Sequence, residues 1–483
     1  MRRSLVISSM LYKFGERFFV RIFGLIVVIV LARYVSNEDF GFLAILLVFE
    51  NFADVFVNSG LPTALVQGRD IQESDYSIAF YIGCGIGCFF VLALFVFAPW
   101  ISNFYKTEVL VWPLRIFSLM LLVHAFNGVK MARLQRKMQF RSQLVCRVIA
   151  AIVSGILGIC LALKGYGLWA LVGYIMTQGV GLSLMLMLAD SWRPSFVFEL
   201  SRAKNLFNFG SRILGVNLLN NLYNGCRPLF IGHQFAVSDL AYYDRGKWIS
   251  EVVSNNYDAT IQSVMLPVLA REQDNSERVK KIIRRTVSLG IFVLTPVLVG
   301  LIVLAKALIV LLITEKWLPA VEYMQILTLA FLAIPVVSTL ITGIVALGYS
   351  GADLRIEVYR KVLQIGTLLY SVLAYDSVIA IAWWFVIGSI ADMILVVCLT
   401  RKYVGYSLQN LFVDSWRVLV ASVVVGGVVY QVSLLGWSNL LTVVSGVAIG
   451  AVVYGVICWI LRVEAFIYVV RILKEKFVAR KEG

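Results

Sequence analysis

Apolar stretches of about twenty residues recur along the whole chain. A helix of about 20 apolar residues spans the hydrocarbon core of a bilayer, and lipid cannot satisfy open backbone hydrogen bonds. The predicted transmembrane helices lie near residues 11–35, 39–59, 76–98, 110–130, 142–163, 166–189, 207–231, 239–265, 286–313, 321–347, 360–375, 378–400, 417–434 and 438–461. Because 360–375 is short and 239–265 is polar, we predict about 14 such helices, within a range of about 12–14.

The composition excludes a soluble protein and gives little support for an enzyme. Apolar residues make up 60% of the chain and charged residues 15%, whereas soluble domains carry about 25% charged residues. The sequence has no phosphate-binding loop of the form G-x-x-x-x-G-K-[ST], and its connections are too short for a catalytic domain. The two histidines, His124 and His233, lack metal-site spacing and are expected to be structural or cavity-lining. We therefore expect a transporter without a metal or cofactor.

Lysine and arginine gather in alternate connections between the predicted helices. Basic runs occur at Lys130–Lys137, Lys280–Arg285, Arg401–Lys402 and Arg471–Lys481, and the intervening connections hold few basic residues. Cytoplasmic loops of membrane proteins carry this excess. Both termini are therefore expected in the cytoplasm, which requires an even number of spans. The net charge of +15 then reflects topology and contact with anionic lipid, not nucleic acid binding.

A weak internal duplication divides the chain into two similar parts. Phe14–Arg17 recurs as Phe209–Arg212, and Gly60–Pro62 is answered by Met265–Pro267. Six predicted spans separate the copies, so we expect two six-helix lobes related by a pseudo-twofold axis along the membrane normal. The predicted parts are an N-terminal lobe at 1–190, a C-terminal lobe at 191–405, two additional transmembrane helices at 406–461, and a basic cytoplasmic tail at 462–483.

Polar side chains recur at helical spacing inside the opening pair of spans of each repeat. Such residues are costly in a membrane, so they should face a water-filled cavity or one another. They are Lys13, Arg17 and Arg21 in the first span, Glu50, Asn51, Asp54 and Asn58 in the second, Asn217, Asn220, Asn221, Asn224 and Arg227 in the seventh, and Glu251, Asn255, Asp258 and Gln262 in the eighth. We expect the four polar faces to meet around one binding cavity.

Simpler explanations stay open for several of these residues. Arg17 and Arg21 lie near a span end, where their side chains could reach the lipid headgroups. The asparagines could join helices by hydrogen bonds without any ligand. Asp54 and Asp258 lie nearer midspan, where a packing role is less expected. Asp392 could titrate, face the interior of the second lobe, or pair with a neighbour.

Five short stretches together resemble one family of membrane transporters. They are Ala32–Gly41, Gly60–Gln67, Leu134–Arg141, Gly167–Val172 and Leu240–Arg245. In this order they resemble the polysaccharide transporters, the Wzx-type oligosaccharide flippases of the multidrug/oligosaccharidyl-lipid/polysaccharide exporter superfamily. The resemblance runs from about residue 10 to about 400 and is nearest to the subgroup serving colanic-acid-like exopolysaccharides and teichuronic acid. One departure is that Arg227–Gly232 replaces the usual Asp-x-x-x-Ile-Gly, so a role of that aspartate cannot be carried over.

The resemblance implies a flippase that moves an undecaprenyl-diphosphate-linked oligosaccharide across the bacterial inner membrane by alternating access. Surface polysaccharide assembly, as exopolysaccharide, O-antigen or capsule, would follow, with a polymerase and glycosyltransferases as partners. Arginine binds phosphate oxygens in a bidentate way, so Arg17, Arg21 and Arg227 are candidates for the diphosphate. The sugar-binding candidates are Asn217, Asn220, Asn221, Asn224 and Asn255. The candidates for proton or sodium coupling are Glu50, Asp54, Asp258 and Asp392.

Two alternatives accompany this hypothesis. The first is another exporter of the same superfamily, either an ion-coupled drug/cation antiporter or a flippase for a peptidoglycan precursor. The second is of a different class, a membrane-embedded polysaccharide polymerase or acyltransferase. The short connections and the scarcity of histidine weigh against the second alternative.

Overall fold

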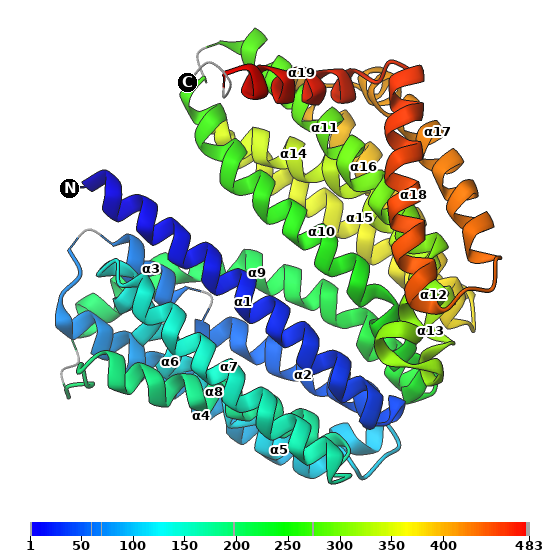
Figure 1. Cartoon of the computed structure of the whole chain (residues 1–483). Coiled ribbons are helices and arrows are strands. Elements are labelled where there is room, and N and C mark those ends of the chain that lie inside the picture. Colours follow the sequence, from blue (N-terminus) through cyan, green and yellow to red (C-terminus); the bar gives the residue numbers. More distant parts are fainter. Residues whose placement is uncertain (1, 59, 69, 197–198, 273–274, 480–483) are drawn as a thin grey trace. The chain divides into compact units, whose positions relative to one another are not determined.

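The computed structural model describes residues 2–58, 60–68, 70–196, 199–272 and 275–479, and every regular element within these ranges is helical. The chain forms two compact units, Met1–Ala241 and Tyr242–Gly483 (Figure 1). Helices of the first unit are α1 (Arg2–Tyr34), α2 (Asn37–Asn58), α3 (Leu61–Gln67), α4 (Glu73–Phe104), α5 (Val111–Ser118), α6 (Met120–Arg136), α7 (Phe140–Leu163), α8 (Leu168–Ala189) and α9 (Leu200–Gln234).

The second unit contains most of α10 and every later helix. These elements are α10 (Val237–Arg271), α11 (Ser276–Val303), α12 (Ala305–Ile313), η1 (Glu315–Trp317), α13 (Ala320–Ala330), η2 (Phe331–Ala333), α14 (Ile334–Ala346), α15 (Ser350–Ala374), α16 (Val378–Val404), α17 (Leu408–Ser433), α18 (Asn439–Ile460) and α19 (Glu464–Ala479). The predicted lobe boundary near residue 190 follows the internal duplication and stays a prediction.

The prediction of an all-helical membrane protein is confirmed. Each predicted span overlaps one or more of these helices. Within the described ranges, ten helical segments are long and apolar enough to cross a membrane. The other long helices, α1, α9, α10 and α15, have 33, 35, 35 and 25 residues and are less apolar. They include three of the four spans whose polar stripes are described above.

Close contacts between helices explain why α9 packs within the first unit. The glycines Gly60, before α3, and Gly210, in α9, meet so closely that a Cβ on Gly60 would lie 2.3 Å from Cα of Gly210. Small residues allow this approach of two backbones in a membrane protein. Helices α7 and α8 meet in the same way, since a Cβ on Gly158 would lie 2.8 Å from Cβ of Tyr174.

The last helices are attached to the second unit by both apolar and ionic contacts. Val418 and Ala421 of α17 and Cys458 of α18 are buried in one core with residues of α11, α14 and α16. Arg284 of α11 donates to both carboxylate oxygens of Asp414 in α17, with Nη2 2.7 Å from Oδ1. The Tyr406 hydroxyl donates to the same carboxylate, and burial raises the pKa of this tyrosine.

The helix around the short predicted span at 360–375 is longer than predicted. Helix α15 begins at Ser350, ten residues before the predicted span, because its charged first half is also helical. There Glu357 pairs with Arg360 at 2.7 Å and with Lys361 at 3.4 Å, at the spacing that stabilises helices. The basic tail contains α19, which runs crosswise to α18 (Figure 1). The Arg285 guanidinium of α11 lies 4.1 Å from the ring centroid of Tyr468 in α19.

Candidate functional site

A histidine lies between two carboxylates in the interior of the first unit. Glu50 and Asp54 are one helical turn apart on α2, and His124 lies on the neighbouring helix α6. His124 Nδ1 is 3.1 Å from Glu50 Oε1 and 3.0 Å from Asp54 Oδ1. Asn58 completes the cluster, because its Nδ2 donates to Asp54 Oδ1 at 2.6 Å. We call these four residues the histidine–carboxylate cluster.

The cluster concentrates charge where water is scarce. Glu50 is only 6% exposed, and Asp54 and His124 are half-buried. Carboxylates inside a helical membrane protein must be paired with cations or proton donors, because their desolvation is costly. Two adjacent carboxylates with one titratable imidazole can take up and release a positive charge. This is the chemistry required for coupling transport to an ion gradient.

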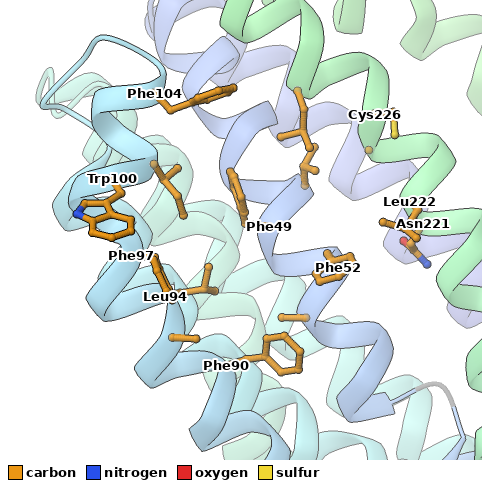
Figure 2. A pocket seen from close by; sticks show the side chains of 16 residues that line it. Phe49, Phe52, Phe90, Leu94, Phe97, Trp100, Phe104, Asn221, Leu222 and Cys226 are labelled. Atoms are coloured by element: carbon orange, nitrogen blue, oxygen red, sulfur yellow. The ribbon is translucent and has the colours of Figure 1, made fainter. Parts of the chain in front are cut away.

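An apolar groove lies on the other side of α2 (Figure 2). It has a volume of about 570 Å³ and is formed by α2, α4 and α9. Aromatic side chains dominate its lining: Phe49 and Phe52 of α2, and Phe90, Phe97, Trp100 and Phe104 of α4. Asn221, Leu222 and Cys226 line it from α9. A surface of this composition suits a hydrocarbon chain better than a sugar or an ion.

Helix α2 is a common wall of the cluster and the groove. Phe49, Phe52 and Ala53 line the groove, while Glu50 and Asp54 contact His124. The residues alternate because a helix turns about 100° per residue, so adjacent residues lie on different faces. A shift of α2 relative to α6 would therefore change the shape of the groove.

The predicted asparagine stripe lies on α9, and one of its residues reaches the groove. Asn221 lines the groove, and its Nδ2 donates to the backbone carbonyl of Asn217 at 3.0 Å. Asn217 and Asn220 are half-buried, and Asn224 is exposed. Helix α9 thus carries amide groups beside an apolar surface. This arrangement can contact both ends of an amphiphilic molecule.

The structure gives different environments to the three candidate arginines. Arg227 is buried, its guanidinium lies 4.8 Å from the ring centroid of Tyr223, and it donates to the Tyr223 hydroxyl. Pro228 does not end the helix, since α9 continues to Gln234. Arg21 is exposed on α1. The side chain of Arg17 lies outside the described residues.

The candidate acids of the second unit each have hydrogen-bond partners. Asp258 of α10 accepts hydrogen bonds from Ser338 and, at 2.9 Å, from Gln262. Asp392 of α16 accepts two hydrogen bonds from Arg360 of α15, each 2.9 Å long. In the structure Asp392 is therefore paired with a neighbour. Its role in ion coupling stays a prediction. Asn255 is exposed on α10.

Comparison with known proteins decides the family. The model of the family described as "Polysaccharide biosynthesis protein" matches residues 30–322, which is more than half of the chain. This chain belongs to that family. A related member, the succinoglycan biosynthesis transport protein ExoT of Rhizobium meliloti (strain 1021), is 25% identical over 90% of this chain and 89% of the relative. The teichuronic acid biosynthesis protein TuaB of Bacillus subtilis (strain 168) is 24% identical, over 79% and 80%.

Solved structures place this polysaccharide biosynthesis protein in a known fold. The lipid II flippase MurJ, in an inward closed conformation, matches with a TM-score of 0.76 and 15% identity, over 93% of this chain and 98% of that chain. An inward-facing multidrug resistance MATE family transporter matches with a TM-score of 0.63 and 15% identity, over 80% and 94%. The chain has the fold of the multidrug/oligosaccharidyl-lipid/polysaccharide exporter (MOP) superfamily. It is a multi-pass membrane transport protein of polysaccharide biosynthesis.

Two partners of the candidate acids, His124 and Arg360, could not be identified from the sequence. His124 was expected to be structural or cavity-lining, but it contacts two coupling candidates. A signal existed, because an imidazole within a predicted span needs a polar partner. Its partners could not be identified, because Asp54 is 70 residues away in the chain. Arg360 lies at the start of a predicted span and gave no sign of its contact with Asp392.

Part of the basic excess of this chain is used for internal contacts. Lys130 is 1% exposed, and its Nζ donates to the backbone carbonyls of Asp190 and Trp192, both at 2.6 Å. Arg202 at the start of α9 pairs with Asp75 of α4 at 3.0 Å. These contacts fix the segment between α8 and α9 to the first unit. Lys130 and Arg202 therefore make internal contacts, and their positive charge does not act on lipid alone.

Proposed function

We propose that this chain is a flippase for an oligosaccharide repeat unit carried on undecaprenyl diphosphate. It would move the unit across the bacterial inner membrane by alternating access, for the assembly of a surface polysaccharide. The family and the named relatives support transport in polysaccharide biosynthesis. The structural observation that supports the finer proposal is α9, where Asn221 lines an aromatic groove and three more asparagines lie on the same helix.

An amphiphilic substrate matches this arrangement part by part. Amide groups donate to and accept from sugar hydroxyls, so the asparagines Asn217, Asn220, Asn221 and Asn224, with Asn255 of the second unit, would contact the oligosaccharide. The prenyl chain would lie against the apolar lining of the groove. Arg17, Arg21 and Arg227 would attract the diphosphate, because a guanidinium binds phosphate oxygens in a bidentate way.

Coupling to an ion gradient would supply the direction of transport. Glu50 and Asp54 are the first candidates, because they form one cluster with His124. Asp258 and Asp392 are the candidates in the second unit. With the basic connections on the cytoplasmic side, both termini would lie in the cytoplasm. A polymerase and glycosyltransferases of the same assembly system would be the protein partners.

The test is the lipid-linked sugar content of cells that lack this gene. The inner membrane is extracted, and its undecaprenyl-linked sugars are identified by mass spectrometry. The proposal expects one complete repeat unit to accumulate on undecaprenyl diphosphate while the surface polymer disappears. A plasmid copy of the gene should reverse both effects. An unchanged lipid-linked pool with intact polymer would contradict the proposal.

A drug/cation antiporter is the second candidate function. The histidine–carboxylate cluster favours it, because a paired acidic site within the membrane also suits exchange of an organic cation for an ion. Such an antiporter would protect cells from cationic drugs. A panel of cationic drugs tested on the deletion strain separates the two functions, since a flippase predicts unchanged susceptibility.

A further inference from the structure

We propose that His124 is the site that binds and releases the coupling proton, held between the carboxylates of Glu50 and Asp54. We further propose that this site selects protons over sodium ions. The role of the site in transport rests on the proposed function. Its existence rests only on the geometry of the first unit. The inference therefore identifies the coupling ion and assigns a role to a residue outside the set of coupling acids.

The distances within the cluster require at least one proton. A single nitrogen, His124 Nδ1, lies 3.1 Å from Glu50 Oε1 and 3.0 Å from Asp54 Oδ1. A nitrogen lone pair and two carboxylate oxygens would repel one another at such distances, so a proton must lie between them. It resides on Nδ1, as a shared donor, or on one of the carboxyl groups. His124 therefore occupies the position where a charge-compensating group is needed.

A sodium ion would require this same position. Hard cations take oxygen ligands, as the calcium and magnesium sites of proteins do. In the cluster the space between the two carboxylates is filled by an imidazole nitrogen instead. The Asp54 oxygen that faces the imidazole also accepts a hydrogen bond from Asn58 Nδ2 at 2.6 Å, a donor that would repel a metal ion. The donor set thus favours a proton.

Other titratable groups on the helices around His124 do not replace these two partners. Helix α4 carries Cys84 and Cys88, α8 carries Tyr174, α5 carries Arg115, and α6 itself carries Lys130 nearly two turns further on. Glu50 and Asp54 are the charged groups that contact His124 within the described part of the chain. The charged groups that determine whether His124 is protonated are thus both on α2.

Loading and unloading change the charge of the cluster by one. With the imidazole protonated at both nitrogens and both carboxylates ionised, the cluster carries one net negative charge. Release of one proton to water leaves two negative charges in a poorly solvated place, which costs free energy. Separation of α2 from α6, or entry of water between them, relieves this cost. Because α2 also lines the groove, a movement of α2 on loading or release of the proton would change the groove surface.

The chain offers a direct spectroscopic test, because it contains only two histidines. The full chain is labelled with ¹⁵N-histidine, placed in nanodiscs and measured by NMR as a function of pH. His233→Gln removes the other imidazole, which contacts the Phe104 carbonyl rather than the cluster, and so assigns the signal of His124. We expect the His124 signal to titrate as a single proton site whose midpoint does not change when NaCl replaces KCl.

The variants Asp54→Asn and Glu50→Gln test the contacts. Each removes a neighbouring negative charge, so each should move the midpoint of His124 to lower pH by about 1–3 units. Glu38→Gln removes an exposed charge at the start of the same helix and should leave the midpoint unchanged. These shifts require only a folded protein, which an unchanged His233 signal would verify when the same variants are made in the chain that keeps His233.

Two results would overturn the inference. One is a His124 signal that does not titrate between about pH 4 and 12, a range that covers histidine beside two carboxylates. The other is a midpoint that falls as sodium is added, since sodium would then compete for the same position. Failure of the flippase proposal is seen elsewhere, in an unchanged lipid-linked sugar pool. A titrating His124 with an unchanged pool would leave a proton site in a transporter of another substrate.

Discussion

At the scale of the residue, Glu50, Asp54 and His124 form one unit, so loss of any one should disturb the same step. Glu50→Gln and His124→Gln keep the size of each side chain but remove its charge or its titration. We expect each to lower polymer export at least about tenfold, as loss of a proton-transferring group commonly does. The measurement is surface polysaccharide per cell at matched membrane levels of protein. Glu38→Gln is the matched control, and normal export by the cluster variants would contradict the assignment.

Asp392 tests whether an acid inside the membrane is structural or functional. Its carboxylate accepts two hydrogen bonds from Arg360, which also contacts Glu357 at 2.7 Å. Asp392→Ala should lower stability by about 3 kcal/mol, the low end for breaking a buried ion pair, because Glu357 remains. Thermal unfolding in detergent measures this, and Arg360→Ala/Asp392→Ala should recover part of the loss. A stable Asp392→Asn protein with lost export would instead favour ion coupling.

At the scale of the element, the sequence predicted helices well and their partners poorly. Apolar runs located α4, α7 and α16, because length and hydropathy alone define a span. The start of α15 was missed, since its first turns are stabilised by charge pairs that hydropathy does not register. The groove was also missed. It could not be predicted, because Phe49 and Phe52 of α2 form it only together with side chains of α4 and α9.

That groove gives a prediction for α4. Ala93 lines the groove, whereas the adjacent Leu92 is 66% exposed and does not. Ala93→Trp should fill part of the 570 Å³ and reduce polymer export severalfold without lowering the amount of protein. Leu92→Trp adds the same side chain to the outer surface of α4 and should have little effect. Equal export by both variants would show that the groove does not take part in transport.

At the scale of the whole molecule, the sequence predicted the fold class and a family resemblance that the comparisons confirm. Transmembrane spans, basic connections and five short motifs are local features, so they can be recognised in a single sequence. The boundary between compact units is not local. It depends on the close approach of Gly60 and Gly210, which brings α9 onto helices of the first unit. A contact between residues 150 positions apart leaves no periodic pattern in the sequence.

Transport by the whole chain should depend on a proton gradient and not on a sodium gradient. The substrate is the lipid-linked repeat unit extracted from the deletion strain, and the protein is reconstituted with it in liposomes. A proton gradient should accelerate the appearance of the oligosaccharide on the far leaflet, because a cycle coupled as proposed would load His124 from one face and unload it to the other. His124→Gln should abolish this acceleration but keep a slow, gradient-independent movement, since the groove and the asparagines are unchanged. A sodium gradient that accelerates the wild-type protein equally would instead assign the carboxylates to sodium and leave His124 a structural neighbour.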